Sequence, residues 1–119
     1  MLKFTVLGSP VGYTRTTQKG CRFDKGYKRY QAYKDHVIAS FLDQCWGGLG
    51  NPNPKPLTTE KGSKTYVSIK IYFKNYVHGD PDNVAKAIND SLFATDKFVS
   101  GSYDFDYDKE NPRVEIQII

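Results

Sequence analysis

Two aspartates and a lysine have the types and spacing needed for metal-assisted chemistry. Asp80 and Asp82 are separated by one residue, and Lys86 follows Asp82 by four residues. Two carboxylates in a turn can face one Mg²⁺ ion, which keeps several waters that substrate phosphates replace. A lysine one helical turn further on can reach the same phosphate and stabilise the charge that develops on it. The spacing therefore predicts metal-dependent hydrolysis of a phosphodiester.

The same residues also have a purely structural interpretation. An aspartate at the start of a helix satisfies free N–H groups, and Asp82, Lys86 and Asp90 have the four-residue spacing of an ordinary surface ion-pair ladder. A further carboxylate, Asp96, follows the expected helix. An unbroken helix from Asp82 to Phe93 would span roughly 17 Å. Asp96 could therefore share a metal with Asp82 only if the chain folds back or a partner subunit supplies one carboxylate.

A basic stretch rich in tyrosine precedes this motif. Of the 17 Lys and Arg residues, 13 lie before Asp80, whereas 9 of the 13 acidic residues lie from Asp80 onward. Cations neutralise phosphates and aromatic rings stack on bases, so the basic half is expected to contact nucleic acid. The alternative is a solvated loop in which two tyrosines belong to the core of the following helix. The residues expected to bind DNA are Tyr13, Arg15, Lys19, Arg22, Lys25, Lys28, Arg29 and Lys74.

The elements that must position these residues follow from the spacing of apolar side chains. Alternating patterns predict strands, and three- and four-residue spacing predicts helices. Polar, glycine-containing segments at 11–29 and 46–64 predict loops. The expected elements are strands at 2–7, 65–75, 103–108 and 113–118 and helices at 30–45 and 82–93. The order β-α-β-α-β-β predicts a single α/β (α+β) domain over residues 1–119. Its mixed sheet has about four strands, the 65–75 strand is central, and two main helices lie on one face.

Other classes of site and location are disfavoured by the sequence. Cys21 and Cys45 lack a zinc-binding pattern and are expected to be free thiols. The alternating aspartates at 104–108 lack the glycine and glutamate of a calcium loop and instead fit a strand face. His36 is expected on a helix surface and His78 in a loop. No signal peptide or membrane span is evident, so a cytoplasmic protein is expected. A sequence pI near 9.0 favours an anionic partner.

The motif resembles that of the RusA family of Holliday junction resolvases. Their signature is D-x-D-N-x-x-K followed by an alanine-rich helix and a further Asp before an apolar residue. The corresponding residues are Asp80-Pro81-Asp82-Asn83-Val84-Ala85-Lys86 and Asp96-Lys97-Phe98-Val99. The likeness covers nearly the whole chain, from the opening strand to the alternating C-terminal segment. Two features depart from the family: the arginine-rich run before the motif is replaced by Phe73-Lys74-Asn75-Tyr76-Val77-His78, and Thr95-Asp96 replaces a pair of acids.

The resemblance implies a homodimeric, magnesium-dependent endonuclease that nicks four-way DNA junctions symmetrically in recombination and repair. It implies that Asp80, Asp82 and Asp96 are catalytic metal ligands and that Lys86 is the catalytic lysine. Small proteins of this family are often carried by phages and prophages. Substitution of Mn²⁺ for Mg²⁺ is left open. Two alternatives also remain, namely a non-catalytic DNA-binding module and a nuclease that acts on branched or flapped DNA generally.

Overall fold

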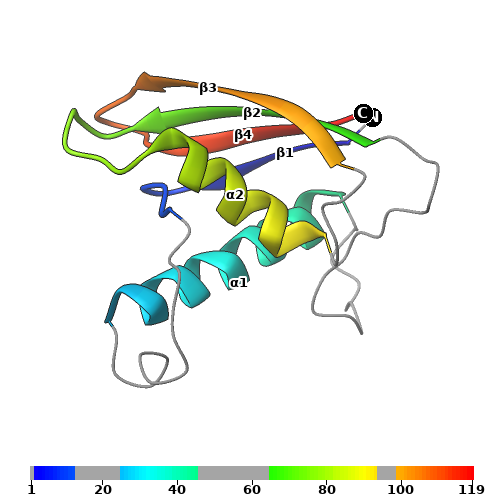
Figure 1. Cartoon of the computed structure of the whole chain (residues 1–119), viewed down its shortest axis with the longest axis horizontal. Coiled ribbons are helices and arrows are strands. Elements are labelled where there is room, and N and C mark those ends of the chain that lie inside the picture. The colour runs from blue at the N-terminus through cyan, green and yellow to red at the C-terminus, as the bar shows by residue number, and fades with distance from the viewer. Residues whose placement is uncertain (1, 13–24, 46–64, 94–98) are drawn as a thin grey trace.

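A four-stranded sheet and two helices make up the computed structural model (Figure 1). The structure describes residues 2–12, 25–45, 65–93 and 99–119, and for residues 25 and 26 the backbone alone. In chain order the elements are β1 (Leu2–Leu7), α1 (Lys25–Cys45), β2 (Thr65–Phe73), α2 (Pro81–Leu92), β3 (Val99–Tyr107) and β4 (Arg113–Ile118). The element order and the α+β class predicted from the sequence are confirmed.

The sheet is mixed, with the strand order β1-β4-β2-β3. Strand β2 pairs parallel to β3 and antiparallel to β4, and β4 pairs antiparallel to β1. The prediction that the 65–75 strand is central is confirmed. Strands β2 and β3 are joined through α2, because parallel neighbours need a crossover connection. Both helices lie on one face of the sheet, as expected (Figure 1).

The core lies between the sheet and the two helices. Alternate residues of β1, β2 and β4 are buried on the helix-facing side, including Phe4, Ile71 and Ile116, whereas β3 has no buried residue. From the helices, Phe41 of α1 and Ile88 of α2 enter the same cluster. The period-two and helical patterns in the sequence therefore identified the buried faces correctly.

Two elements begin four or more residues earlier than predicted. Helix α1 begins at Lys25 rather than residue 30, so the expected loop at 11–29 overlaps the helix. A helix can extend one turn past its buried stripe, and here Gln31 Nε2 donates to Tyr27 Oη at 2.6 Å in that turn. Strand β3 begins at Val99 rather than residue 103. Its polar start, Ser100 to Ser102, has no apolar alternation and is extended because it pairs with β2.

Helix α2 has the N-cap that its sequence predicts. Asp80 is the N-cap, Pro81 occupies the first turn, and the Phe93 N–H donates to the Asn89 carbonyl at the other end. Proline suits this position because its missing N–H would have no partner there. Neither α1 nor α2, the two helices in the described part of the chain, is long and apolar enough to cross a membrane.

Candidate active site and nucleic-acid interface

Asp80 stands at the point where the β2–α2 connection becomes helix. Its backbone is extended, with φ −67° and ψ 126°, and its Oδ1 accepts a hydrogen bond from the Asp82 N–H at 3.0 Å. The structural interpretation of Asp80 as a helix cap is therefore confirmed. The cap uses one oxygen of an exposed carboxylate, so it does not by itself decide whether Asp80 also binds a metal.

Asp82 and Lys86 lie one above the other on α2, as their spacing predicts. Lys86 Nζ is 3.6 Å from Asp82 Oδ2, and the side chains are 61% and 47% exposed respectively. A loose pair between exposed groups contributes little to stability. Both charges are therefore accessible to a substrate.

Two carboxylates are too few to enclose a metal ion completely, but they match the small number of protein ligands that magnesium uses. Among the described residues, no group of three or more His, Cys, Asp or Glu side chains is close enough to hold an ion. Magnesium is usually held by one or two carboxylates and keeps waters that substrate phosphates replace. Asp80 and Asp82, two residues apart at the open end of α2, provide that kind of donor set.

The predicted third carboxylate, Asp96, lies outside the described residues. Its described neighbours in the chain are Phe93, which follows α2, and Val99, which starts β3. Helix α2 is continuous from Pro81 to Leu92, so Phe93 lies at the opposite end of the helix from Asp80. The distance argument made from the sequence therefore applies to α2 as observed, and the role of Asp96 stays a prediction.

Two residues predicted to bind DNA meet at one groove although they are distant in sequence. Arg29 of α1 and Lys74, which follows β2, both line a groove of about 440 Å³ that His78 and Gly79 also line. Gly79, which lines this groove, is the residue that precedes Asp80. Its other wall is formed by residues 9–12, and a Cβ added at Gly12 would lie 3.2 Å from the Asn83 Cβ. Two cations are thus placed beside the start of α2.

The other predicted DNA contacts are only partly described. Lys28 is exposed on the first turns of α1, next to Arg29. Tyr13, Arg15, Lys19 and Arg22 lie outside the described residues, as does the side chain of Lys25. The structure therefore brings Arg29 and Lys74 together and leaves the contacts from the basic stretch before α1 as predictions.

His78 is the residue that sequence reasoning undervalued. The sequence places it in a loop two residues before Asp80, from where it could face the site, and in the structure its ring stacks on Phe73 with centroids 3.8 Å apart and an interplanar angle of 7°. Its Nδ1 lies 2.7 Å from the Gly79 carbonyl, and its Nε2 lies 2.9 Å from Tyr107 Oη. These contacts hold the peptide before Asp80 against the end of β3. Only its position two residues before Asp80 hinted at this.

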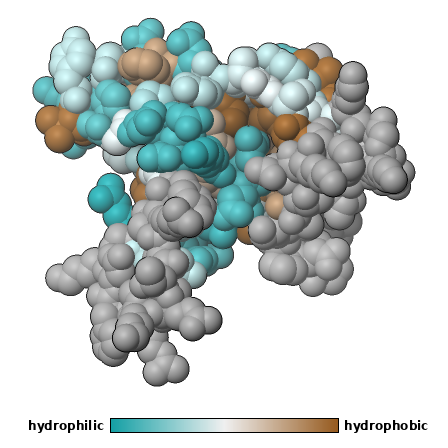
Figure 2. Space-filling model, in the orientation of Figure 1, coloured by the Kyte–Doolittle hydropathy of each residue, from teal (hydrophilic) through white to brown (hydrophobic). Residues whose placement is uncertain are grey.

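A second groove runs between α2 and β3. It has a volume of about 190 Å³, and its lining includes Asp82, Lys86 and Asn89 from α2 together with Gly101 and Tyr103 from β3. The Oδ1 atom of Asn89 is buried and has no hydrogen-bond partner among the described atoms. In the space-filling view, hydrophilic side chains predominate over α2, and hydrophobic surface is exposed between α2 and the sheet (Figure 2).

Asp90 does not simply extend the surface ladder of Asp82 and Lys86. Its Oδ2 lies 2.8 Å from Lys34 Nζ and accepts a hydrogen bond from Tyr30 Oη at 2.7 Å, so it ties α2 to α1. The four-residue spacing therefore predicts the Asp82–Lys86 pair but misses the contacts of Asp90 with α1. The sequence could not show that the third position faces another helix.

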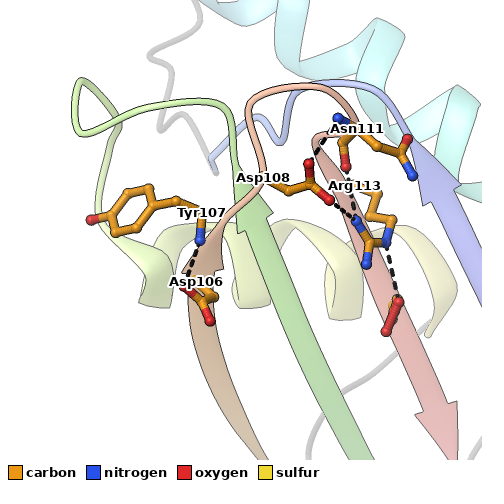
Figure 3. A network of polar contacts seen from close by, with 6 residues as sticks. Asp106, Tyr107, Asp108, Asn111 and Arg113 are labelled. Carbon is orange, nitrogen blue, oxygen red and sulfur yellow. Dashed lines mark hydrogen bonds and ion pairs between the residues drawn. The ribbon is translucent and has the colours of Figure 1, made fainter.

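The three alternating aspartates lie on or just beyond β3, in agreement with the predicted strand. The Lys70 ammonium donates to Asp104 at 2.9 Å and lowers the pKa of that carboxyl. Asp108, just beyond β3, accepts from Arg113 at 2.8 Å, which lowers its pKa in turn (Figure 3). Asp106 instead accepts from the Tyr107 N–H. Each carboxylate therefore has a separate role on or beside the sheet.

Comparison with known proteins adds no family assignment. No protein-family model matches the chain, and no curated protein matches it. The fold and the geometry of the site define an α+β domain with an open, acidic helix start beside a groove that contains two cations.

Proposed function

We propose that this chain is a magnesium-dependent, structure-selective DNA endonuclease that resolves four-way junctions by paired symmetric nicks. The observation that carries the proposal is the arrangement at the start of α2. Exposed Asp80, half-exposed Asp82 and exposed Lys86 lie along the first half of α2, and the groove lined by Arg29 and Lys74 extends to Gly79, the residue before Asp80. The proposal includes a homodimer, since a twofold enzyme matches a substrate with twofold symmetry. It also includes a bacterial or phage-host cytoplasm, where DNA of that kind is found.

The residues divide the work by charge. Arg29 and Lys74 would bind backbone phosphates beside the site, as cations do when they displace counterions. Asp80 and Asp82 would hold the magnesium ion, which when bound polarises the phosphoryl oxygen and activates a water. Lys86 would stabilise negative charge on the phosphate as the bond breaks.

His78 would act through the position of Asp80. Its contacts with Phe73, Tyr107 and the Gly79 carbonyl restrict the peptide that leads into the cap. A metal ligand held in one place needs less reorganisation when substrate binds, which favours reaction. His78 is accordingly a positioning residue in this proposal and does not contact the substrate.

The test is Asp82→Asn, which keeps the size of the side chain but removes its charge. Junction binding should persist while magnesium-dependent nicking falls by at least about 100-fold. Asp43→Asn is the matched control, because Asp43 is an exposed acid on α1. Binding is measured by gel shift in Ca²⁺, and nicking by denaturing gel in Mg²⁺ or Mn²⁺. Full cleavage by the Asp82 variant would exclude the assignment.

The substrate class is tested by comparing a four-way junction, a flap and a linear duplex under the same conditions. Paired, symmetric cuts in the junction support the proposal. Equal cleavage of the flap would support a nuclease for branched DNA generally.

A non-catalytic DNA-binding module is the second candidate. Two observations favour it: Asp80 caps α2, and Asp82 pairs with Lys86. Both contacts are ordinary for a helix start with no catalytic role. This candidate predicts salt-sensitive binding of DNA through Arg29 and Lys74 and no cleavage of any substrate with any divalent metal.

A further inference from the structure

The outer edge of β3 is paired with no other strand in the described part of the chain. The Asp108 N–H donates to the Phe73 carbonyl at 2.8 Å, so the even-numbered residues of this strand direct their backbone groups toward β2. In a parallel ladder the alternate residues then direct theirs away. Those alternate residues include Gly101, Tyr103 and Phe105. An edge of this kind is able to pair with another strand.

The same alternate residues place aromatic side chains on the helix-facing side of the edge. Tyr103 lies beside Ile69 of β2, and Phe105 lies beside Ile71. The isoleucines are 4% and 0% exposed, but Tyr103 and Phe105 remain 46% and 42% exposed. The aromatic residues therefore extend the core layer by one strand, with no described element covering their outer side.

We propose that a second copy of this chain covers the edge, with β3 pairing antiparallel to β3 of its partner about a twofold axis at Tyr103. This deepens the proposed function, because it gives the homodimer an interface. The register places Tyr103 opposite its own copy, Gly101 opposite Phe105 and Val99 opposite Tyr107. All nine residues of β3 are then paired.

Charge disfavours the registers centred further along the strand, and a register centred on Ser102 would pair only residues 99–105 of β3. Centring the axis on Asp104 would place that aspartate opposite its copy, and centring it on Phe105 would place Asp104 opposite Asp106. Like charges directly opposite one another destabilise a strand pair. With the axis at Tyr103, Asp104 and Asp106 instead face Ser102 and Ser100. A serine hydroxyl can donate to each carboxylate. Ser102 Oγ accepts from Tyr66 Oη at 2.8 Å in the single chain, which leaves its own proton able to donate.

The aspartates also make the edge selective. In the single chain, Asp104 Oδ1 accepts from the Phe105 N–H and Asp106 Oδ1 from the Tyr107 N–H, both at 2.8 Å. These bonds cover two edge donors and discourage pairing with arbitrary strands. When the serines of a partner strand donate to Asp104 and Asp106, the Phe105 and Tyr107 N–H groups become free to pair with that strand, and the carboxylates keep a donor. Asp104 also keeps its contact with Lys70 through Oδ2.

Gly101 fits the same arrangement. A Cβ added at this position would clash with the Val67 carbonyl oxygen, so a side chain cannot be accommodated without a shift of the backbone. Without a side chain, Gly101 adds no apolar cover to the helix-facing side of the strand. In the proposed register an aromatic ring, Phe105 of the partner subunit, lies opposite and can cover it.

The proposed twofold axis places the two candidate sites on the same face of the dimer. Because the axis is perpendicular to the joined sheet, α2 and its copy lie on the same face. The groove between α2 and β3 that Asp82 and Lys86 line borders this edge. Both Asp82–Lys86 pairs would then face one side of the dimer, as two symmetric nicks in one junction require.

Disulfide trapping tests the register. Hydrogen-bonded antiparallel partners have Cα atoms about 5.5 Å apart, within disulfide range. In a Cys21→Ser, Cys45→Ser background, Tyr103→Cys should form a covalent dimer under mild oxidation. Phe105→Cys is the control, because its two copies would be displaced by four residues, about 13 Å along the strands. Preferential trapping of Ser102→Cys would overturn the register, and no trapping at Tyr103→Cys would overturn the interface.

Mass in solution tests the interface without any engineered thiol. The wild-type chain should elute with twice the single-chain mass of 13.5 kDa in light scattering. Tyr103→Lys, which would oppose two lysines at the axis, should give the single-chain mass with unchanged circular dichroism. Leu7→Lys, at an exposed position on β1 that is 59% accessible, should stay dimeric. A wild-type monomer, or dimeric Tyr103→Lys, overturns the proposal.

The outcome is independent of catalysis. The trapping is repeated with Asp82→Asn, which should cross-link like the parent. If the Tyr103→Cys chain with Asp82 intact is trapped as a dimer but cleaves no DNA, the interface is supported and the endonuclease is not. An active enzyme that stays monomeric argues the reverse.

Discussion

At the β1 edge, side chains of α1 occupy the backbone groups of the strand. Gln44 accepts from the Thr5 N–H at 2.9 Å and donates to the Thr5 carbonyl at 2.7 Å. His36 contacts the Leu7 carbonyl at 2.7 Å, and Cys45 Sγ donates to the Lys3 carbonyl at 3.4 Å. At the β3 edge the described contacts come only from aspartates of the strand itself.

The difference separates a closed side of the molecule from an open one. The closed side places long polar side chains of α1 along β1, which removes the risk of unwanted strand pairing. On the open side, the exposed Tyr103 of β3 lines one groove with Asp82 and Lys86 of α2. We infer that the β1 side serves stability and the β3 side serves function.

The largest expected effect comes from a substitution on the open side that should lower activity and leave stability unchanged. Lys86→Gln should lower nicking by about 100-fold, because it removes a charge that stabilises the developing oxyanion. The unfolding midpoint should hardly change, since the pair with Asp82 is exposed and 3.6 Å long. Lys109→Gln, an exposed lysine after β3, is the control. Wild-type nicking by the Lys86 variant would remove the chemical role of the open side.

The contact that joins the two helices should give the next largest effect. Asp90→Asn weakens the bonds to Lys34 and Tyr30 that tie α2 to α1. We expect a loss of about 1.5 kcal/mol in the free energy of unfolding, typical of hydrogen bonds to a charged group. Urea titration measures it, and Asp35→Asn, an exposed acid on α1, serves as control. An unchanged midpoint would mean that the helices are held by apolar packing alone.

Opening the closed edge should have a smaller effect on stability. Gln44→Ala removes both hydrogen bonds to Thr5, and water can replace them, so we expect a loss of about 1 kcal/mol. Self-association should increase, because the β1 edge becomes available for pairing. Asp43→Ala, at the exposed position before it, is the matched control in light scattering. Comparable behaviour of the two variants would show that the bonds do not protect this edge.

The smallest expected effect is on the pH dependence of stability at the end of β3. Arg113 lowers the pKa of Asp108, so the folded state binds this proton less readily than the unfolded state. The stabilisation is present above the unfolded pKa, about 4, and is lost as the pH falls through the folded value. Arg113→Gln should therefore flatten the acid limb of a plot of urea midpoint against pH. An unchanged limb would contradict this assignment.

Much of the fold could be predicted because its patterns are local. Alternating residues in β2 and β4 and the three- and four-residue spacing in α2 mark buried faces that tertiary packing then uses. The cap at Asp80 and the pairing of Asp82 with Lys86 follow from helix geometry alone. The start of β3 could not be predicted, because Ser100 to Ser102 are extended only through pairing with β2.

The sequence by itself determined which residues could do chemistry at the start of α2, since caps and four-residue spacing depend only on neighbours in the chain. Only the tertiary structure decided which distant residues share that end of the molecule. It brought Arg29 to Lys74, turned Asp90 toward α1 and placed His78 between Phe73 and Tyr107. It also decided which edge of the sheet is covered, because the order of strands and the side of each helix depend on packing over the whole core.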